Sequence, residues 1–302
     1  MHGSSSLTCL TRNSSGKTAA YLVPVLSRLM GKAKRLCAPR PSPLRYNAAT
    51  DAVQAQPLVL IICPTRELAM QIFDDARRFC YRTMLRPAVL YGGGPMSEQL
   101  GELKRGCDVL IGTPGRLKDV ITTRSQWLSL DKLKYTIIDE ADELLQDDWE
   151  EEMKHLLGGG AANMEGDHQF MMFSATFDKN ARSLARKYLA DDYVRIRVGR
   201  SGSTHANIRQ DVIWVDENQK QKALNDLLLD LPPCRTLVFV NATQKADIVD
   251  DFLYNMEFPV TSIHAGRTQR EREDAIRAFR RGTCPVMVAT AISARGLDIK
   301  NV

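Results

Sequence analysis

Short runs of apolar residues, each about as long as a β-strand, recur along this chain and constrain its fold more than any other feature. The runs are continuous and do not alternate with polar residues, which is typical of strands buried on both faces of a parallel sheet. Several end in small or polar residues just before a segment of helical periodicity, so we predict an α/β protein whose parallel strands are connected by helices. The predicted strands are Leu58–Cys63, Ala88–Tyr91, Val109–Gly112, Tyr135–Ile138, Phe170–Phe173, Val212–Val215, Thr236–Val240, Val260–Ile263 and Val286–Ala289.

Two segments interrupt this rhythm. Ala38–Gln56 is rich in Pro, Ala and Asn, and we interpret it as an exposed insertion loop. Val198–Ala206 is rich in Gly and Ser, which predicts a flexible linker. Because 302 residues suffice for two domains, we place the boundary in this second segment and predict domains at residues 1–204 and 205–302.

Composition narrows the class of protein. With 44% hydrophobic and 25% charged residues, the chain is typical of soluble globular proteins. Its apolar runs are far shorter than the ~20 residues of a membrane-spanning helix, so we expect no membrane partner. None of the seven cysteines forms a C-x-x-C pair, which predicts reduced thiols, no zinc site and an intracellular protein, either cytosolic or nuclear; of these two locations we favour the cytoplasm. The net charge of +5 permits a nucleic-acid partner without requiring one.

A Gly-Lys-Thr sequence near the N-terminus predicts a phosphate-binding loop. In Ser15-Gly16-Lys17-Thr18 the glycine precedes a helical segment, whose first N–H groups could bind phosphate oxygens. Lys17 would reach the outer phosphates, and the Thr18 hydroxyl would hold Mg²⁺. Thr11 stands where the usual pattern has its first glycine, so an ordinary Gly-Lys turn remains the alternative.

Two adjacent carboxylates follow the predicted strand Tyr135–Ile138. Sheets of this class place ligands at the carboxyl ends of their strands, where Asp139 could bind the hydrated Mg²⁺ and Glu140 could deprotonate an attacking water. An acidic helix start is the alternative, because more acidic residues follow. The position after an apolar strand and downstream of a phosphate loop favours the catalytic interpretation. Ser174 and Thr176, at the end of another predicted strand, carry hydroxyls that could link these carboxylates to a neighbouring domain.

Taken together, these motifs resemble those of the DEAD-box RNA helicases of superfamily 2. That family is named after an Asp-Glu-Ala-Asp motif, which is present here as Asp139-Glu140-Ala141-Asp142. The motifs follow the order of that family over nearly the whole chain. The motifs at Gln269 with Arg272 and at Ala294–Ile299 would be absent from an unrelated P-loop enzyme such as a transporter ATPase or a GTPase. Asp251–Val302 most resembles the Vasa and Belle subgroup. The other motifs are Pro64-Thr65-Arg66-Glu67-Leu68-Ala69, Gly92-Gly93, Thr113-Pro114-Gly115-Arg116, Ser174-Ala175-Thr176, Leu237-Val238-Phe239-Val240, Gln269 with Arg272, and Ala294-Arg295-Gly296-Leu297-Asp298-Ile299.

The resemblance implies two RecA-like parallel-sheet domains in tandem that close over ATP and single-stranded RNA. It implies an enzyme that hydrolyses ATP to drive RNA binding, local duplex unwinding and remodelling, with a role in translation. Its implied cofactors are ATP and Mg²⁺. The implied catalytic residues are Lys17, Asp139, Glu140, Ser174 and Thr176; Thr18 and Asp139 hold the metal, and Ser14, Ser15, Gly16, Lys17, Thr18 and Asp298 bind the nucleotide.

The same resemblance implies RNA contacts in both domains. Arginines, hydroxyls and main-chain N–H groups suit phosphates and ribose better than base edges, so binding is expected to be independent of sequence. The implied RNA-binding residues are Pro64, Thr65, Arg66, Gly93, Thr113, Gly115 and Arg116 in the first domain and Gln269, Arg272 and Thr290 in the second.

Some features depart from the family pattern. No residues match the upstream motif that recognises adenine, and Ser14 stands where the family has glycine. The terminal arginine motif would lie beyond Val302, so we expect a second domain that is incomplete at its C-terminus. These departures leave open an alternative, a catalytically impaired RNA-binding fragment. In His264-Ala265-Gly266, where the family often has His-Gly-Asp, we expect His264 to be a packed structural histidine.

Overall fold

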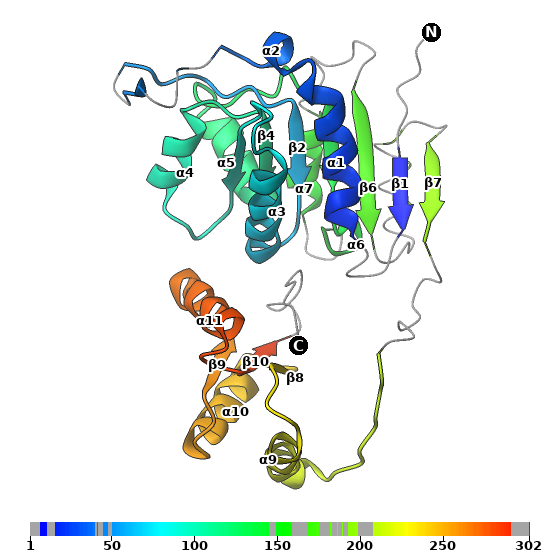
Figure 1. Ribbon diagram of the computed structural model, residues 1–302, viewed down its shortest axis with the longest axis vertical. Helices are drawn as coiled ribbons and strands as arrows, with labels where there is room; N and C mark the ends of the chain where they lie inside the picture. The colour runs from blue at the N-terminus through cyan, green and yellow to red at the C-terminus, as the bar shows by residue number, and fades with distance from the viewer. Residues whose placement is uncertain are drawn as a thin grey trace. The chain divides into compact units, whose positions relative to one another are not determined.

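The computed structural model divides the chain into two compact units, residues 1–203 and 204–302 (Figure 1). Both are α/β units with parallel sheets, which confirms the predicted fold class. The structure describes residues 7–10, 16–39, 41, 45–47, 50–144, 149–158, 168–174, 182, 186, 189, 193–198, 208–290 and 302.

The first unit contains a seven-stranded sheet of order β3-β4-β2-β5-β6-β1-β7, in which neighbouring strands are parallel. All four residues of β2 and of β4 are buried, as expected for strands covered on both faces. The strands are β1 (Leu7–Leu10), β2 (Val59–Ile62), β3 (Pro87–Leu90), β4 (Val109–Gly112), β5 (Tyr135–Ile138), β6 (Gln169–Ser174) and β7 (Val194–Arg197).

Helices cover both faces of this sheet. Val59 and Ile61 belong to a core cluster with α1 and α3, which lie over the same face in Figure 1. The alternate residues Leu60 and Ile62 pack into a second cluster with α4, α5, α6 and α7. Two apolar faces on one strand explain why its sequence does not alternate. The helices are α1 (Lys17–Met30), α2 (Ala33–Leu36), α3 (Arg66–Phe79), α4 (Met96–Leu103), α5 (Pro114–Thr123), α6 (Ala141–Leu144) and α7 (Glu150–Gly158).

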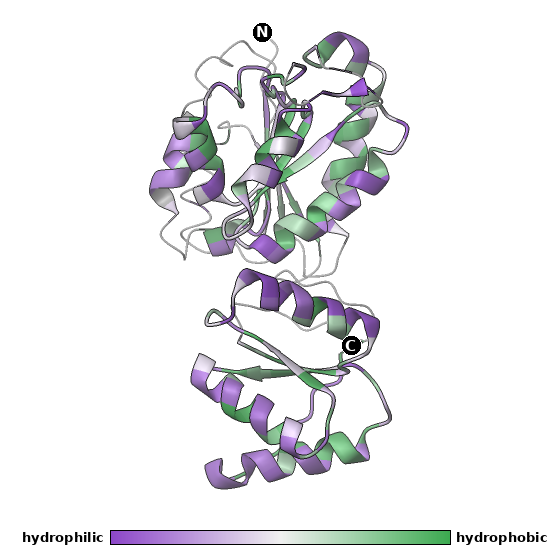
Figure 2. Ribbon diagram, turned by 90° about the vertical axis from the view of Figure 1, so that its left-hand side faces the viewer, coloured by the Kyte–Doolittle hydropathy of each residue, from purple (hydrophilic) through white to green (hydrophobic). Residues whose placement is uncertain are grey.

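The second unit has a smaller parallel sheet of order β8-β10-β9. Helix α11 packs on one face through Phe279, and α10 packs on the other through Leu253. Apolar residues follow the strands, whereas the outer faces of the helices are hydrophilic (Figure 2). The elements are η3 (Glu217–Gln219), α9 (Lys220–Asp230), β8 (Thr236–Val240), α10 (Thr243–Asn255), β9 (Val260–Ile263), α11 (Gln269–Arg281) and β10 (Val286–Thr290).

All but one of the predicted strands form, with ends within one residue of the prediction. The prediction at Val212–Val215 is wrong: this segment has no strand, and Val212 and Trp214 are 98% and 86% exposed. Composition alone favours a strand there, but a strand also needs a neighbour to accept its hydrogen bonds. The strands β1 and β7 were not predicted. The alternation of arginine with apolar residues in β7 is typical of an exposed edge.

The predicted insertion loop is anchored at its C-terminal end. Ala55 is fully buried and pairs with Leu128 in an isolated bridge, so an exposed loop over the whole of Ala38–Gln56 is wrong for that end. The N–H of Val53 also donates to the Lys104 carbonyl at 2.9 Å. The predicted linker Val198–Ala206 lies outside the described residues, except for Val198.

Candidate functional site

Those predicted residues of the first unit that the structure describes gather at one edge of its sheet. Parallel strands end at the same edge, so motifs far apart in the sequence become neighbours there. The loop after β2 is central: the N–H of Asp139, after β5, donates to the Ile62 carbonyl at 2.9 Å, while the N–H of Cys63 donates to the Gly112 carbonyl of β4 at 3.1 Å. The motif Pro64-Thr65-Arg66 therefore lies between the acidic pair and the motif that begins at Thr113.

A left-handed glycine begins the candidate phosphate site. Gly16 has φ 77° and ψ 23° and immediately precedes α1, whose first residue is Lys17. Nothing lies within 4 Å of the position that a Cβ would take. Glycine is therefore favoured here by the left-handed backbone conformation and not by a shortage of space. The N-terminus of α1 suits an anion. Of the other residues predicted to bind the nucleotide or perform catalysis, Ser14, Ser15, Thr176 and Asp298 lie outside the described residues.

The first carboxylate of the acidic pair is held between two donors. Asp139 is 3% exposed; its Oδ2 accepts from the Tyr21 hydroxyl at 3.0 Å and its Oδ1 accepts from the Glu140 N–H at 3.0 Å. Burial raises the pKa of Asp139, while Lys17 and the Tyr21 hydroxyl oppose that rise. Thr18 also hydrogen-bonds the Tyr21 side chain. Tyr21 was not predicted, although its position one helical turn after Lys17 places both side chains on one face of α1.

Glu140 has an unusual backbone and an unusual acidity. Its φ is 50°, a left-handed conformation that costs a non-glycine residue ~1–2 kcal/mol. Its pKa is raised to about 8, chiefly by burial and also by the charges of Glu143 and Asp139, while Lys17 opposes the rise. Oε2 of Glu140 is buried and has no hydrogen-bond partner in the part of the chain that the structure describes. A carboxyl group that titrates near neutral pH can accept a proton from water, as a general base must.

The donor set fits Mg²⁺ shared with a phosphate better than a metal held by protein alone. Within the described ranges, no group of three His, Cys, Asp or Glu side chains could hold a metal ion. Mg²⁺ usually takes only one or two protein carboxylates together with phosphate oxygens and water. Asp139 and the Thr18 hydroxyl are the residues available for that role. Ser174, the last residue of β6, is fully buried beside this region.

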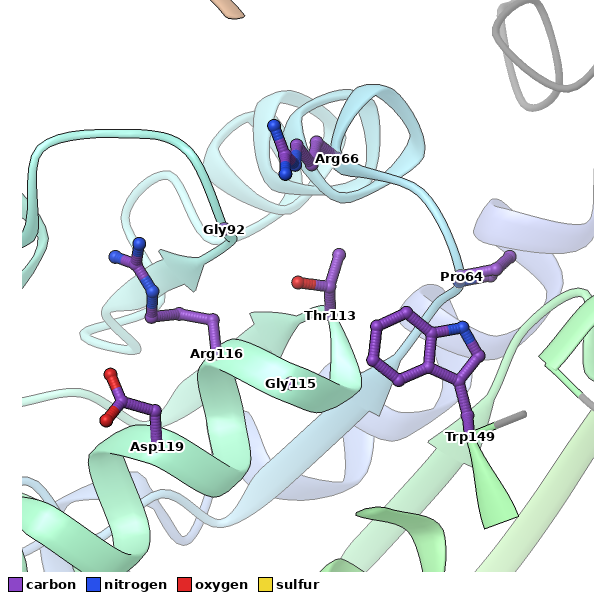
Figure 3. Close-up of a pocket in the computed structure, with 8 residues that line it drawn as sticks. All are labelled: Pro64, Arg66, Gly92, Thr113, Gly115, Arg116, Asp119 and Trp149. Atoms are coloured by element: carbon purple, nitrogen blue, oxygen red, sulfur yellow. The ribbon is translucent and has the colours of Figure 1, made fainter. Parts of the chain in front are cut away.

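A pocket of about 320 Å³ lies at the same edge of the sheet (Figure 3). Arg66 and Arg116 extend along one side of it, and the indole of Trp149 stands on the opposite side, beside Gly115. Five of the predicted RNA-binding residues therefore meet in one place, whereas Trp149 and Asp119 were not predicted. The residues that line the pocket are Pro64, Arg66, Gly92, Thr113, Gly115, Arg116, Asp119 and Trp149.

Two other predicted residues shape the surroundings of the pocket. Thr65 caps α3, since its hydroxyl accepts from the Leu68 N–H at 3.3 Å. Gly93 has φ 80°, and a Cβ at this position would overlap Nη1 of Arg66. The backbone conformation therefore favours glycine at 93, and any larger residue would displace the Arg66 guanidinium.

A buried glutamine forms hydrogen bonds to the backbone of Tyr91, just before the turn at Gly92–Gly94. Gln99 is 8% exposed; its Oε1 accepts from the Tyr91 N–H and its Nε2 donates to the Tyr91 carbonyl, both at 3.0 Å. Nη2 of Arg116 donates to the Gly94 carbonyl of this turn at 3.4 Å. Burial lowers the pKa of Arg116, and the charge of Arg66 adds to that effect. Gln99 was not predicted, because a polar residue in a first helical turn carries no signal of burial.

In the second unit, the predicted residues also lie at the carboxyl edge of the sheet. Thr290 ends β10, while Gln269 begins α11, which also carries Arg272, and Gln269 donates to Glu273 at 3.1 Å. His264 is 3% exposed, as expected of a structural histidine. Its Nε2 lies 3.0 Å from Oδ1 of Asp247, and its Nδ1 accepts from the Gly266 N–H at 3.2 Å.

No helix among the described residues is both long and apolar enough to span a membrane.

Comparison with known proteins identifies two family models along the chain. Residues 1–184 match the DEAD/DEAH box helicase family, and residues 219–302 match the helicase conserved C-terminal domain. The matched ranges contain every site residue predicted above.

Solved structures show the same architecture. The yeast DEAD-box splicing factor Prp28 is 27% identical, with a TM-score of 0.55, and the match covers 99% of this chain and 65% of that one. S. cerevisiae Dbp5 bound to RNA and ADP BeF3 is 23% identical (TM-score 0.76; 99% and 68% covered), and Mss116p bound to ssRNA and AMP-PNP is 21% identical (TM-score 0.83; 100% and 60% covered). This likeness confirms two RecA-like parallel-sheet domains, the second of them shorter. The chain spans about two thirds of the length of these structures.

Proposed function

This chain belongs to the DEAD/DEAH box helicase family, and from that premise we propose that it binds single-stranded RNA and uses ATP hydrolysis to remodel it. One observation carries the proposal. The strand β2 is hydrogen-bonded to β5, which ends at the acidic pair, and to β4, which ends at the arginine pocket. Its own loop, Pro64-Thr65-Arg66, joins the two regions. A displacement of this loop by RNA would thus reach the carboxylates directly.

On the nucleotide side, the N-terminus of α1 and Lys17 bind and orient the phosphates. Thr18 and Asp139 hold Mg²⁺, which would neutralise phosphate charge when bound. Glu140 accepts the proton of the attacking water, a task that fits its raised pKa of about 8. Tyr21 fixes the carboxylate of Asp139 through the 3.0 Å hydrogen bond.

On the RNA side, Arg66 and Arg116 supply charge for backbone phosphates, and the hydroxyl of Thr113 can reach a ribose or phosphate oxygen. These groups recognise the backbone and not the bases, so we propose binding that does not depend on RNA sequence. Gln269, Arg272 and Thr290 supply the corresponding contacts of the second domain. Ser174 and Thr176 couple the two activities.

The test is ATP hydrolysis by the 302-residue chain with and without single-stranded RNA, beside the variant Glu140→Gln and the RNA-side variant Arg116→Gln. We expect turnover that RNA stimulates, that Glu140→Gln abolishes, and that requires more RNA for stimulation in Arg116→Gln. Salt-dependent RNA binding without turnover would favour the alternative of an RNA-binding protein that does not hydrolyse ATP. Absence of both RNA binding and turnover would refute the proposal.

We further propose a place for this protein within its family. The resemblance of Asp251–Val302 to the Vasa and Belle subgroup supports a role in translation of mRNA and a cytoplasmic location. Expression of a tagged chain, followed by fractionation of polysomes, tests this assignment. Association with polysomes that RNase releases is the expected result, and an exclusively nuclear protein would contradict it.

A further inference from the structure

We propose that Trp149 contacts RNA directly, and that its indole forms the wall of the pocket against which a nucleotide packs while its phosphate meets Arg66 and Arg116. This inference rests on the proposed binding of RNA. Trp149 belongs to none of the sequence motifs, and the proposal places it in the same RNA-binding pocket as Arg66 and Arg116. The aromatic ring and the two guanidinium groups stand on opposite sides of the pocket (Figure 3).

The position of Trp149 is fixed by the packing of α7 on α5. The Met153 N–H donates to the Trp149 carbonyl at 2.9 Å, which ties the residue to the first turn of α7. Lys118 of α5 and Glu152 of α7 form an ion pair at 3.1 Å that joins the two helices nearby. The indole is therefore presented by a packed helix start and needs no rearrangement to face the pocket.

The ring also lies directly against the predicted RNA motif. A Cβ on Gly115 would come within 3.2 Å of Cζ3 of Trp149, so the glycine allows the indole to approach the start of α5. The ring then borders the pocket beside Thr113 and Gly115, the residues whose hydroxyl and backbone are suited to ribose and phosphate. An aromatic face next to such groups is the usual means of holding an unpaired nucleotide.

A purely structural role for Trp149 explains less. The residue is only half-buried, and its Nε1 is buried without a hydrogen-bond partner among the residues that the structure describes. A phenylalanine would also pack against the core here, and it would leave no polar atom unpaired. What the indole adds is a broad aromatic surface on the side that faces the arginines.

The experiment combines intrinsic fluorescence with an independent binding assay. The chain has three tryptophans, so the difference between the wild type and Trp149→Phe isolates the signal of this indole. RNA binding is measured in parallel by the anisotropy of a labelled oligouridylate. We expect the wild type to be quenched with the same midpoint as the anisotropy, and Trp149→Phe to lose that quenching while binding RNA with similar affinity.

A second variant separates aromatic contact from simple packing. Trp149→Leu fills space but has no aromatic face, so we expect it to weaken RNA binding roughly 5- to 150-fold, the range found when an aromatic stacking partner is removed. Its thermal unfolding and its affinity for a fluorescent ATP analogue should match those of Trp149→Phe. The first of these measurements reports the stability of the fold, and the second reports the nucleotide site.

The outcomes distinguish this inference from the function on which it rests. If RNA binds by anisotropy but the Trp149 signal is unchanged and Trp149→Leu binds as well as Trp149→Phe, the contact is refuted and the proposed function stands. If no variant binds RNA, both fail.

Discussion

Replacing Glu140 by glutamine should stabilise the first domain, and the gain should grow as the pH rises. The folded state raises the pKa of Glu140 from 4.5 to about 8, chiefly because burial disfavours the charged form. Between these two values the folded state holds a proton that the unfolded chain has released. The stability of the wild type therefore falls as the pH rises through this window, and glutamine, which cannot titrate, avoids the loss.

The size of the effect follows from the shift. Each pKa unit corresponds to ~1.4 kcal/mol, so the full cost of an ionised Glu140 approaches ~5 kcal/mol above about pH 8 and vanishes below about pH 4.5. Relaxation of the neighbouring acids and entry of water would reduce this cost to roughly 2–4 kcal/mol. For a domain of this size, such a gain raises the melting temperature by roughly 4–16 °C.

The assay is scanning calorimetry of the wild type and Glu140→Gln at about pH 5 and about pH 8.5, without nucleotide. The matched control is Glu152→Gln: Glu152 has a lowered pKa because it hydrogen-bonds its own backbone and Lys118. Its ionised form stabilises the folded state, so neutralising it should bring no gain at high pH. A stability difference for Glu140→Gln that is the same at both pH values would refute the reasoning.

Two further predictions concern residues that position others. Tyr21→Phe removes the hydroxyl bound to Asp139 and should weaken Mg²⁺-dependent binding of a fluorescent ADP roughly 10- to 150-fold, the range set by one hydrogen bond to a charged group; equal losses with and without Mg²⁺ would contradict it. Gln99→Leu removes both hydrogen bonds between the Gln99 side chain and the Tyr91 backbone, so we expect ~1–3 kcal/mol lower stability in urea and weaker RNA binding with a shallower salt dependence. Ser97→Ala, at an exposed position of the same helix, is the control, and unchanged RNA affinity in Gln99→Leu would disprove a positioning role.

Strand prediction succeeded where burial left a clear pattern. The runs at β2 and β4 are apolar throughout because helices cover both faces, β5 is apolar except for Thr136, and each run was placed within one residue. Prediction failed where hydrogen bonding to a neighbouring strand decides whether a segment forms a strand. The sequence of β7 alternates with arginine and its residues are exposed. Val212–Val215 has the composition of a strand but pairs with no strand among the residues that the structure describes.

The sequence by itself determined the parts of the site that depend on contiguous residues. Gly16-Lys17-Thr18 and Asp139-Glu140 are recognisable because a glycine in the left-handed region, a helix start and a strand end are local properties of the backbone. The tertiary structure alone decided which residues Tyr21, Gln99 and Trp149 contact. Each acts on a residue of a different motif or element through a side-chain contact, and such contacts depend on how the elements pack, which no local pattern of residues records.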